Sequence, residues 1–166
     1  MSPNEFDKLM IPPAHEAMGI KTSPESRVMM IAICLQESNL THRVQVLANG
    51  GRGPARGVSQ FEKGGVRGVW KHHISHEPLR LLCKARDVSF DIDPIWASLE
   101  FDDVMAAGLT RLLLLTDPRP LPSVGDPVGS WAYYLRCWRP GKPHPSRWPS
   151  CHEQAVNQVL DQDPQP

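Results

Sequence analysis

Glu37 is the residue whose type and setting first indicate chemistry in this chain. It ends an apolar segment and is followed by Ser38, Asn39 and a glycine-rich stretch. A carboxyl group at such a boundary is partly withdrawn from water, which raises its pKa toward the range that a general acid needs near neutral pH. The alternative interpretation of this position alone is a glutamate at a helix end that points into solvent.

A second set of candidates lies in the segment Gly57-Val-Ser-Gln60 and in the pair Tyr133-Tyr134. Glycine lets the backbone approach a ligand closely, because no Cβ intervenes. The amide of Gln60 can both donate and accept hydrogen bonds. A tyrosine can stack on a ligand or orient Glu37 through its hydroxyl, and its alternative role is that of an ordinary core aromatic.

These segments together resemble the lysozyme-like superfamily, which contains goose-type lysozymes and bacterial lytic transglycosylases. Those families place Glu-Ser at the end of a buried helix, then a Gly-x-x-Gln turn, then an aromatic helix carrying Ala-Tyr-Asn-Ala-Gly or a relative. This chain has Gln36-Glu37-Ser38, Gly57-Val-Ser-Gln60 and Ala132-Tyr-Tyr-Leu135, the last without the Asn and the Gly. The resemblance covers residues 24–64 and, more loosely, residues 127–140.

The resemblance implies a muramidase, a glycosidase that cleaves the β-1,4 bond between N-acetylmuramic acid and N-acetylglucosamine in bacterial peptidoglycan. Glu37 is then the general acid that protonates the leaving oxygen. No metal or organic cofactor is required. The residues implied to bind the glycan are Ser38, Gly57, Ser59, Gln60, Tyr133 and Tyr134.

Glu62 bears on whether the products are hydrolysed or anhydro sugars. The sequence between Ser38 and Gln60 contains no Asp or Glu, and lytic transglycosylases work with one glutamate, using a hydroxyl group of the sugar as nucleophile. Goose-type lysozymes carry an Asp in the place that Glu62 takes here, where it helps to position the attacking water. Glu62 is therefore the candidate second catalytic residue of a hydrolase, and its alternative role is a solvated helix charge.

The composition disfavours several other functions. Lys+Arg and Asp+Glu both number 18, whereas a nucleic-acid binder normally shows a basic surplus. The longest strongly apolar run, Leu112 to Leu115, is far too short for membrane insertion. The four cysteines show no CxxC spacing and are expected to be reduced and structural. The stretch HHISHE at 72–77 is not HExxH, so it predicts no metal site.

Three arginines lie near the expected cleft, and the sequence leaves their role open. They either keep a loop soluble or attract the acidic peptides of peptidoglycan. These residues are Arg52, Arg56 and Arg67.

The pattern along the chain predicts one mainly α, lysozyme-like domain over residues 1–160, followed by a frayed tail over 161–166. A glycine-rich loop or small β-hairpin turning at Asn49-Gly50 is expected beside the active-site cleft. Thr22 and Glu25 have capping-box spacing before a helix that runs through Glu37. Further helices are expected over 4–11, 14–18, 65–73, 77–86, 93–115, 127–138 and 146–160, with Pro12-Pro13 ending the first.

The N-terminus lacks the cationic start and apolar core of a secretory signal. An enzyme that acts on the wall would then need another route out of the cytoplasm. By analogy we expect a bacteriophage protein, either an endolysin held in the host cytoplasm before release to the cell wall or a component of the virion with tail proteins as partners. The alternative function is a non-catalytic virion or glycan-binding module that keeps the fold without turnover.

Overall fold

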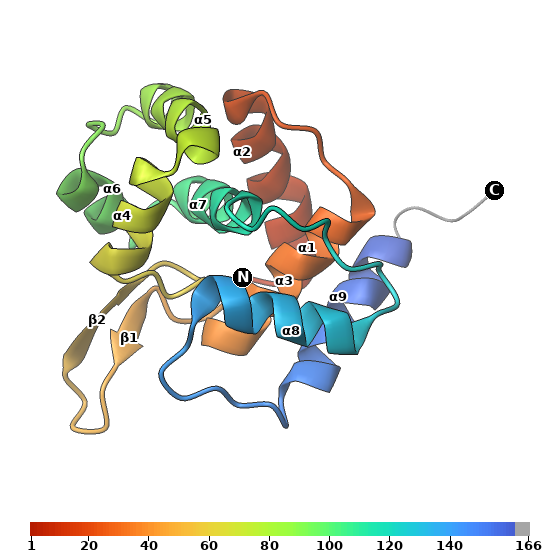
Figure 1. Cartoon of the computed structure of the whole chain (residues 1–166). Helices are drawn as coiled ribbons and strands as arrows, with labels where there is room; N and C mark the ends of the chain where they lie inside the picture. Colours follow the sequence, from red (N-terminus) through yellow and green to blue (C-terminus); the bar gives the residue numbers. More distant parts are fainter. Residues whose placement is uncertain (162–166) are drawn as a thin grey trace.

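Helices make up most of the chain, and a two-stranded antiparallel hairpin projects beside them (Figure 1). The computed structural model describes residues 1–161, so nearly all of the tail expected to fray lies outside the described residues. The expected mainly α fold with a small β-hairpin is confirmed. Its elements are α1 (Pro3–Glu5), the π-helix η1 (Phe6–Met10), α2 (Ile11–Met18), α3 (Pro24–Ser38), β1 (Val44–Val46), β2 (Arg52–Arg56), α4 (Lys63–Lys71), α5 (His73–Ala85), α6 (Ile92–Ser98), α7 (Asp103–Leu115), α8 (Pro127–Trp138) and α9 (Trp148–Leu160).

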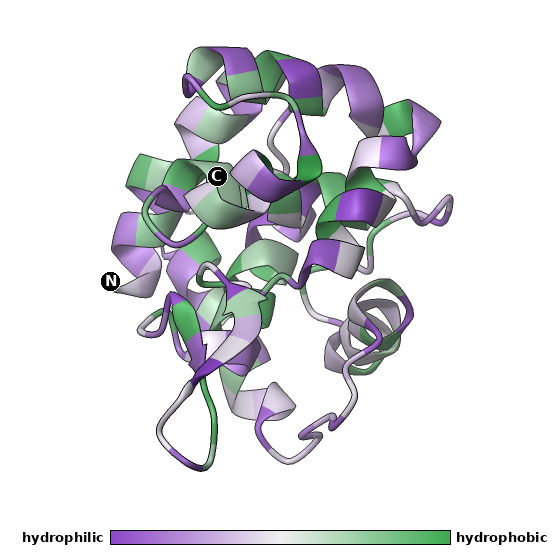
Figure 2. Ribbon diagram, turned by 90° about the vertical axis from the view of Figure 1, so that its left-hand side faces the viewer, coloured by the Kyte–Doolittle hydropathy of each residue, from purple (hydrophilic) through white to green (hydrophobic). Residues whose placement is uncertain are grey.

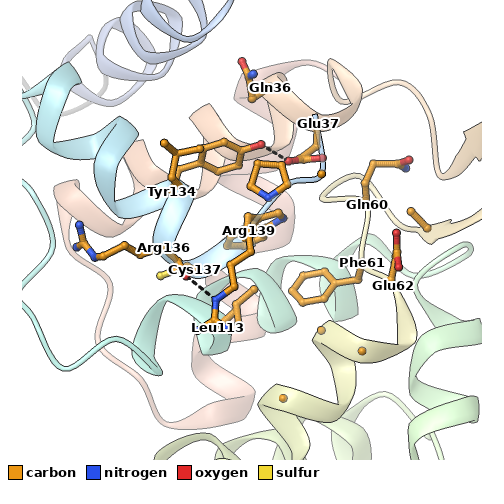
Figure 3. Close-up of a pocket in the computed structure, with 18 of the residues that line it drawn as sticks. Gln36, Glu37, Gln60, Phe61, Glu62, Leu113, Tyr134, Arg136, Cys137 and Arg139 are labelled. Atoms are coloured by element: carbon orange, nitrogen blue, oxygen red, sulfur yellow. Dashed lines mark hydrogen bonds between the residues drawn. The ribbon is translucent and has the colours of Figure 1, made fainter. Parts of the chain in front are cut away.

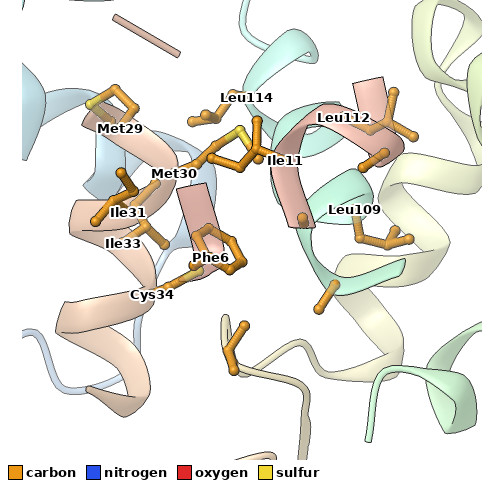
Figure 4. Close-up of a cluster of buried hydrophobic side chains, with 14 of the residues drawn as sticks. Phe6, Ile11, Met29, Met30, Ile31, Ile33, Cys34, Leu109, Leu112 and Leu114 are labelled. Carbon is orange, nitrogen blue, oxygen red and sulfur yellow. The ribbon is translucent and has the colours of Figure 1, made fainter. Parts of the chain in front are cut away.

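The core forms where α3 and α7 are both buried on most of their surface. Val28 to Leu35 are all buried in α3, and Met105 to Thr110 are all buried in α7. Side chains of both helices meet Phe6 and Ile11 from the N-terminal helices (Figure 4). The outer helices carry both hydrophobic and hydrophilic residues (Figure 2), as expected for helices that bury one face. Because most of α3 is buried, the position of its last turn at the protein surface is fixed.

The N-terminal helices differ from the prediction, because Pro12-Pro13 does not stop them. The chain turns helically from Pro3 to Met18, with the π-helical stretch η1 in between. Both prolines fall in the first turn of α2, where the missing N–H groups have no intrahelical acceptor to lose. The helix ends instead at Gly19, which takes the left-handed conformation with φ of 65°.

The N-cap of helix α3 lies one residue later than predicted. Ser23 is the N-cap and forms the capping box with Ser26, while Pro24 takes the first turn as expected. Thr22 instead hydrogen-bonds Nδ1 of His15 at 2.7 Å. The predicted N-cap was wrong because the residue that completes the capping box at N3 is a serine, Ser26, and not the glutamate Glu25.

The single helix expected over 93–115 is two helices, α6 and α7. Residues 99–102 turn between them, and Asp102 starts α7 by accepting hydrogen bonds from the backbone N–H groups of Val104 and Met105 at 3.0 Å. Asp91 caps α6, two residues before the expected start. An aspartate that satisfies the free N–H groups of a new helix favours a break over continuation.

The hairpin turns where Asn49-Gly50 predicted it. Val44 pairs with Arg56 and Val46 with Arg52, and Gly50 has a φ of 79°. None of the helices within residues 1–161 is long and apolar enough to cross a membrane. All four cysteines are unpaired.

Candidate active site

A groove of about 1610 Å³ lies beside the C-terminal end of α3. Its walls come from segments far apart in the sequence: the hairpin, the N-terminal part of α4, the C-terminal half of α8 and the loop over 139–147. The volume exceeds the 300–1,000 Å³ typical of sites for drug-sized ligands. A groove of this size can hold an extended ligand rather than one small molecule.

Glu37 lies in the last turn of α3 and lines this groove. Most of α3 is buried, but the side chain of Glu37 is only half-buried. Asn39 ends the helix in the left-handed conformation with φ of 54°. Burial raises the pKa of the Glu37 carboxyl, and this effect outweighs the hydrogen bond from Tyr134 and the positive charge of Arg147, which lower it. The carboxyl therefore holds its proton to a higher pH than an exposed glutamate does.

Tyr134 orients that carboxyl from the opposite helix. Its hydroxyl donates a hydrogen bond of 2.5 Å to Oε1 of Glu37 (Figure 3). The ring packs against both Trp131 and Trp148, with centroid separations of 5.2 and 5.1 Å, and these two tryptophans contact each other at 5.4 Å. Burial, together with the nearby Glu37, holds the pKa of this hydroxyl far above its ordinary value, so the hydroxyl remains a donor.

Of the two tyrosines, only Tyr134 lines the groove. Asp126 caps α8 and Pro127 takes its first turn, as predicted, which sets the rotation of the helix. Tyr133 is buried on the other side, where its hydroxyl donates to the carbonyl oxygen of Leu114 at 2.8 Å. Tyr133 is a core residue, so assigning it to the glycan was wrong.

The Gly57-Val-Ser-Gln60 segment is a turn held against the end of α3. The hydroxyl of Ser38 is buried and donates its one hydrogen to the carbonyl oxygen of Val58 at 2.6 Å, with the carbonyl oxygen of Cys34 as a longer contact at 3.2 Å. Ser59 is fully buried. Neither serine lines the groove, so their assignment to the glycan was wrong, and Ser38 instead fastens the turn to the helix that carries Glu37.

Gly57 has a structural role that differs from the predicted one. Its φ of 74° lies in the left-handed region, and a Cβ added here would come within 3.1 Å of both Cβ and O of Leu99 and within 3.3 Å of Cβ of Ala106. The absent side chain therefore allows close packing against the α6–α7 connection. Gly57 does not line the groove.

Gln60 and Glu62 both line the groove, on a different part of its wall from Glu37 (Figure 3). Gln60 has a φ of 54°, and its amide nitrogen donates to the carbonyl oxygens of Gly57 at 2.9 Å and His42 at 3.2 Å. Those bonds fix the amide and leave its oxygen as the group that can accept from a ligand. Glu62 is exposed and immediately precedes α4.

The three arginines near the expected cleft do not line the groove. Arg52 and Arg56 pair with Glu100 on the other side of the hairpin, and Arg56 also lies over the ring of Trp96 at 4.4 Å. Arg67 is exposed on α4. Within residues 1–161 no three His, Cys, Asp or Glu side chains are grouped in a way that would hold a metal ion.

Trp138 and Arg147 are among the groove residues that were not predicted as site residues. Trp138 lines the groove, donates from Nε1 to the carbonyl oxygen of Ser59 at 3.0 Å and meets Phe61 edge-on at 5.5 Å. Arg147 donates to the carbonyl oxygen of Leu35 at 3.1 Å, which places its charge near Glu37. The density of basic and proline residues between 139 and 147 was the signal that could have indicated a structured loop at the site.

No family model matches the chain, and no curated protein or solved structure matches it significantly. The chemistry of the groove is therefore inferred from its own residues.

Proposed function

We propose that this chain is a glycosidase that cleaves the β-1,4 bond between N-acetylmuramic acid and N-acetylglucosamine of peptidoglycan, with Glu37 as the general acid. The observation that carries the proposal is the half-buried Glu37 carboxyl in the groove wall, with its pKa raised by burial and its orientation fixed by the hydroxyl of Tyr134. Glycosidic cleavage requires a carboxylic acid that is still protonated near neutral pH.

Proton transfer from Glu37 to the glycosidic oxygen would leave a carboxylate in the groove wall. The hydroxyl of Tyr134 and the positive charge of Arg147 both stabilise that carboxylate. The same two groups thus position the acid before transfer and compensate its charge afterwards. Trp138 supplies an aromatic surface in the groove, and the amide oxygen of Gln60 accepts from a hydroxyl or N-acetyl group of the glycan.

Glu62 is the carboxylate proposed to direct a water molecule against the sugar. It is exposed in the same groove as Glu37, where its side chain can accept a proton from a water molecule. With Glu62 in this role the products carry a free reducing end. If Glu37 works alone, a hydroxyl group of the sugar itself attacks and the products are 1,6-anhydro sugars.

The test is clearing of purified sacculi by the wild type, by Glu37→Gln and by Glu16→Gln. Glu16 is an exposed glutamate on α2 that does not line the groove, so it is the matched control for the loss of one carboxylate. We expect clearing by the wild type and Glu16→Gln, and a loss of about 10²- to 10⁴-fold in Glu37→Gln. Equal rates for wild type and Glu37→Gln would contradict the proposal.

Product masses then resolve the role of Glu62. We expect reducing muropeptides from the wild type and a large rate loss in Glu62→Gln. Anhydro products from the wild type, with Glu62→Gln as active as wild type, would show that Glu37 acts alone. Binding of sacculi without any release of products would favour the non-catalytic module.

A further inference from the structure

The end of the groove formed by α8 and the loop over 139–147 carries uncompensated positive charge. Arg139, Lys142 and Arg147 line it, and all three are exposed. None of them forms an ion pair with a carboxylate within residues 1–161. Because the whole chain has no net charge, this cluster is a local asymmetry at the groove.

Two neighbouring arginines form ion pairs instead. Arg119 and Arg136 also line the groove, and both pair with Asp117, at 3.0 and 2.9 Å. Their guanidinium groups are therefore held by a carboxylate of the protein, which compensates one of the two positive charges. The guanidinium of Arg139 makes one hydrogen bond, from Nε to the carbonyl oxygen of Arg136 at 3.3 Å, which leaves its other N–H groups for a ligand.

The loop that carries these cations is fastened next to the candidate acid. The amide nitrogen of Gln36 donates to the carbonyl oxygen of His144 at 3.0 Å, and Arg147 donates to the carbonyl oxygen of Leu35 at 3.1 Å. Both acceptor and donor positions on α3 lie within two residues of Glu37. A ligand held at Glu37 therefore presents its nearby substituents to the basic end of the groove.

We propose that Arg139 and Lys142 bind the carboxylates of the peptides attached to the muramic acid, so that the groove prefers peptide-bearing glycan over bare glycan. This inference rests on the proposed function. Guanidinium and ammonium groups are the natural partners of carboxylates, and a groove lined by one sign of charge concentrates ligands of the other. A chitin-like glycan has no negative group to occupy this end.

The test measures affinity in the Glu37→Gln background, where the ligand is not consumed. The probes are fluorescently labelled glycan strands in three forms: with their peptides, with the peptide carboxylates amidated, and with the peptides removed. The variants are Lys142→Gln alone, Arg139→Gln with Lys142→Gln, and the control Arg67→Gln with Lys84→Gln. Arg67 and Lys84 are exposed, lie outside the groove and form no ion pair within the described residues, so the control removes the same charge.

We expect the Arg139→Gln, Lys142→Gln pair to weaken binding of peptide-bearing strands by about two- to thirtyfold, the range for two exposed ion pairs. Lys142 lies on an exposed loop, so Lys142→Gln alone should not affect folding. It should give part of the loss of affinity for peptide-bearing strands. Binding of amidated or stripped strands should change less than twofold, and the control pair should match the parent on all three. An equal loss on all three strand forms, an equal loss in the control pair, or no loss would each overturn the inference.

The two proposals fail in distinguishable ways. If the wild type cleaves neither peptide-bearing nor stripped strands while the carboxylate-dependent affinity is present, the proposed catalytic function is wrong and the binding site stands. If the wild type cleaves both forms with equal kcat/KM and the affinities do not depend on the carboxylates, the catalytic function stands and the inference is wrong.

Discussion

Replacing Ser38 by alanine should destabilise the fold, because its hydroxyl connects the end of α3 to the turn at Val58. The hydroxyl is buried and its bond to the carbonyl oxygen of Val58 is 2.6 Å long. Val58 is itself fully buried, so the deletion leaves its carbonyl without that donor and away from water. Such an unsatisfied group costs about 1–3 kcal/mol.

Ser59→Ala is the matched control, because it makes the same chemical change one residue beyond Val58. Ser59 is also fully buried, but its hydroxyl has no hydrogen-bond partner within the described residues. Removing it should leave the free energy of unfolding unchanged or raise it by up to about 1 kcal/mol, since a polar group is no longer buried unsatisfied. The backbone oxygen of Ser59, which accepts from Trp138, is untouched.

Urea unfolding of both variants at neutral pH measures the difference directly, and thermal unfolding provides a second reading. For a chain of this size about 1 kcal/mol corresponds to roughly 2–4 °C in Tm, so Ser38→Ala should unfold about 2–12 °C below the wild type. If the two variants are equally stable, the Ser38–Val58 hydrogen bond does not hold the turn, and the reasoning is refuted.

Three further outcomes follow from the site and its supporting turn. Tyr134→Phe removes the hydrogen bond that lowers the pKa of Glu37, so the alkaline limb of kcat/KM against pH should move to higher pH; a shift to lower pH would contradict this. Glu37→Gln should unfold at higher urea than wild type at neutral pH, because ionising a carboxyl whose pKa is raised costs stability as pH rises, and this gap should close in acid. Gly57→Ala should lower the free energy of unfolding by about 1–3 kcal/mol from left-handed strain and contact with Leu99, and by more than Gly50→Ala, whose added Cβ meets nothing within 4 Å.

Local signals in the sequence were sufficient for the elements that frame the site. Asn49-Gly50 marked the hairpin turn and Asp126-Pro127 the start of α8, because a turn or a cap is determined by the few residues that form it. The apolar run before Glu37 indicated a buried helix that opens at its end. These features frame the groove that Glu37, Gln60 and Glu62 line.

What the sequence did not determine depends on tertiary packing. Whether Tyr133 or Tyr134 faces the groove follows from the rotation of α8 against α7 and α9, and neighbouring residues on a helix point in different directions. Ser38 and Gly57 were assigned to ligand binding only through a resemblance in sequence. The hydroxyl of Ser38 instead bonds Val58, and Gly57 packs against Leu99, contacts that a short motif does not reveal. The positive end of the groove depends on how the loop over 139–147 folds back onto α3.

The most direct test of Glu37 as a general acid compares two soluble substrates that differ only in their leaving group. One is a muramyl oligosaccharide with a sugar leaving group, and the other carries a dinitrophenolate in its place, which departs without protonation. We expect Glu37→Gln to lose about 10²- to 10⁴-fold in kcat on the first and far less on the second. An equal loss on both substrates, or no loss on the first, would contradict the assignment of Glu37 as the acid.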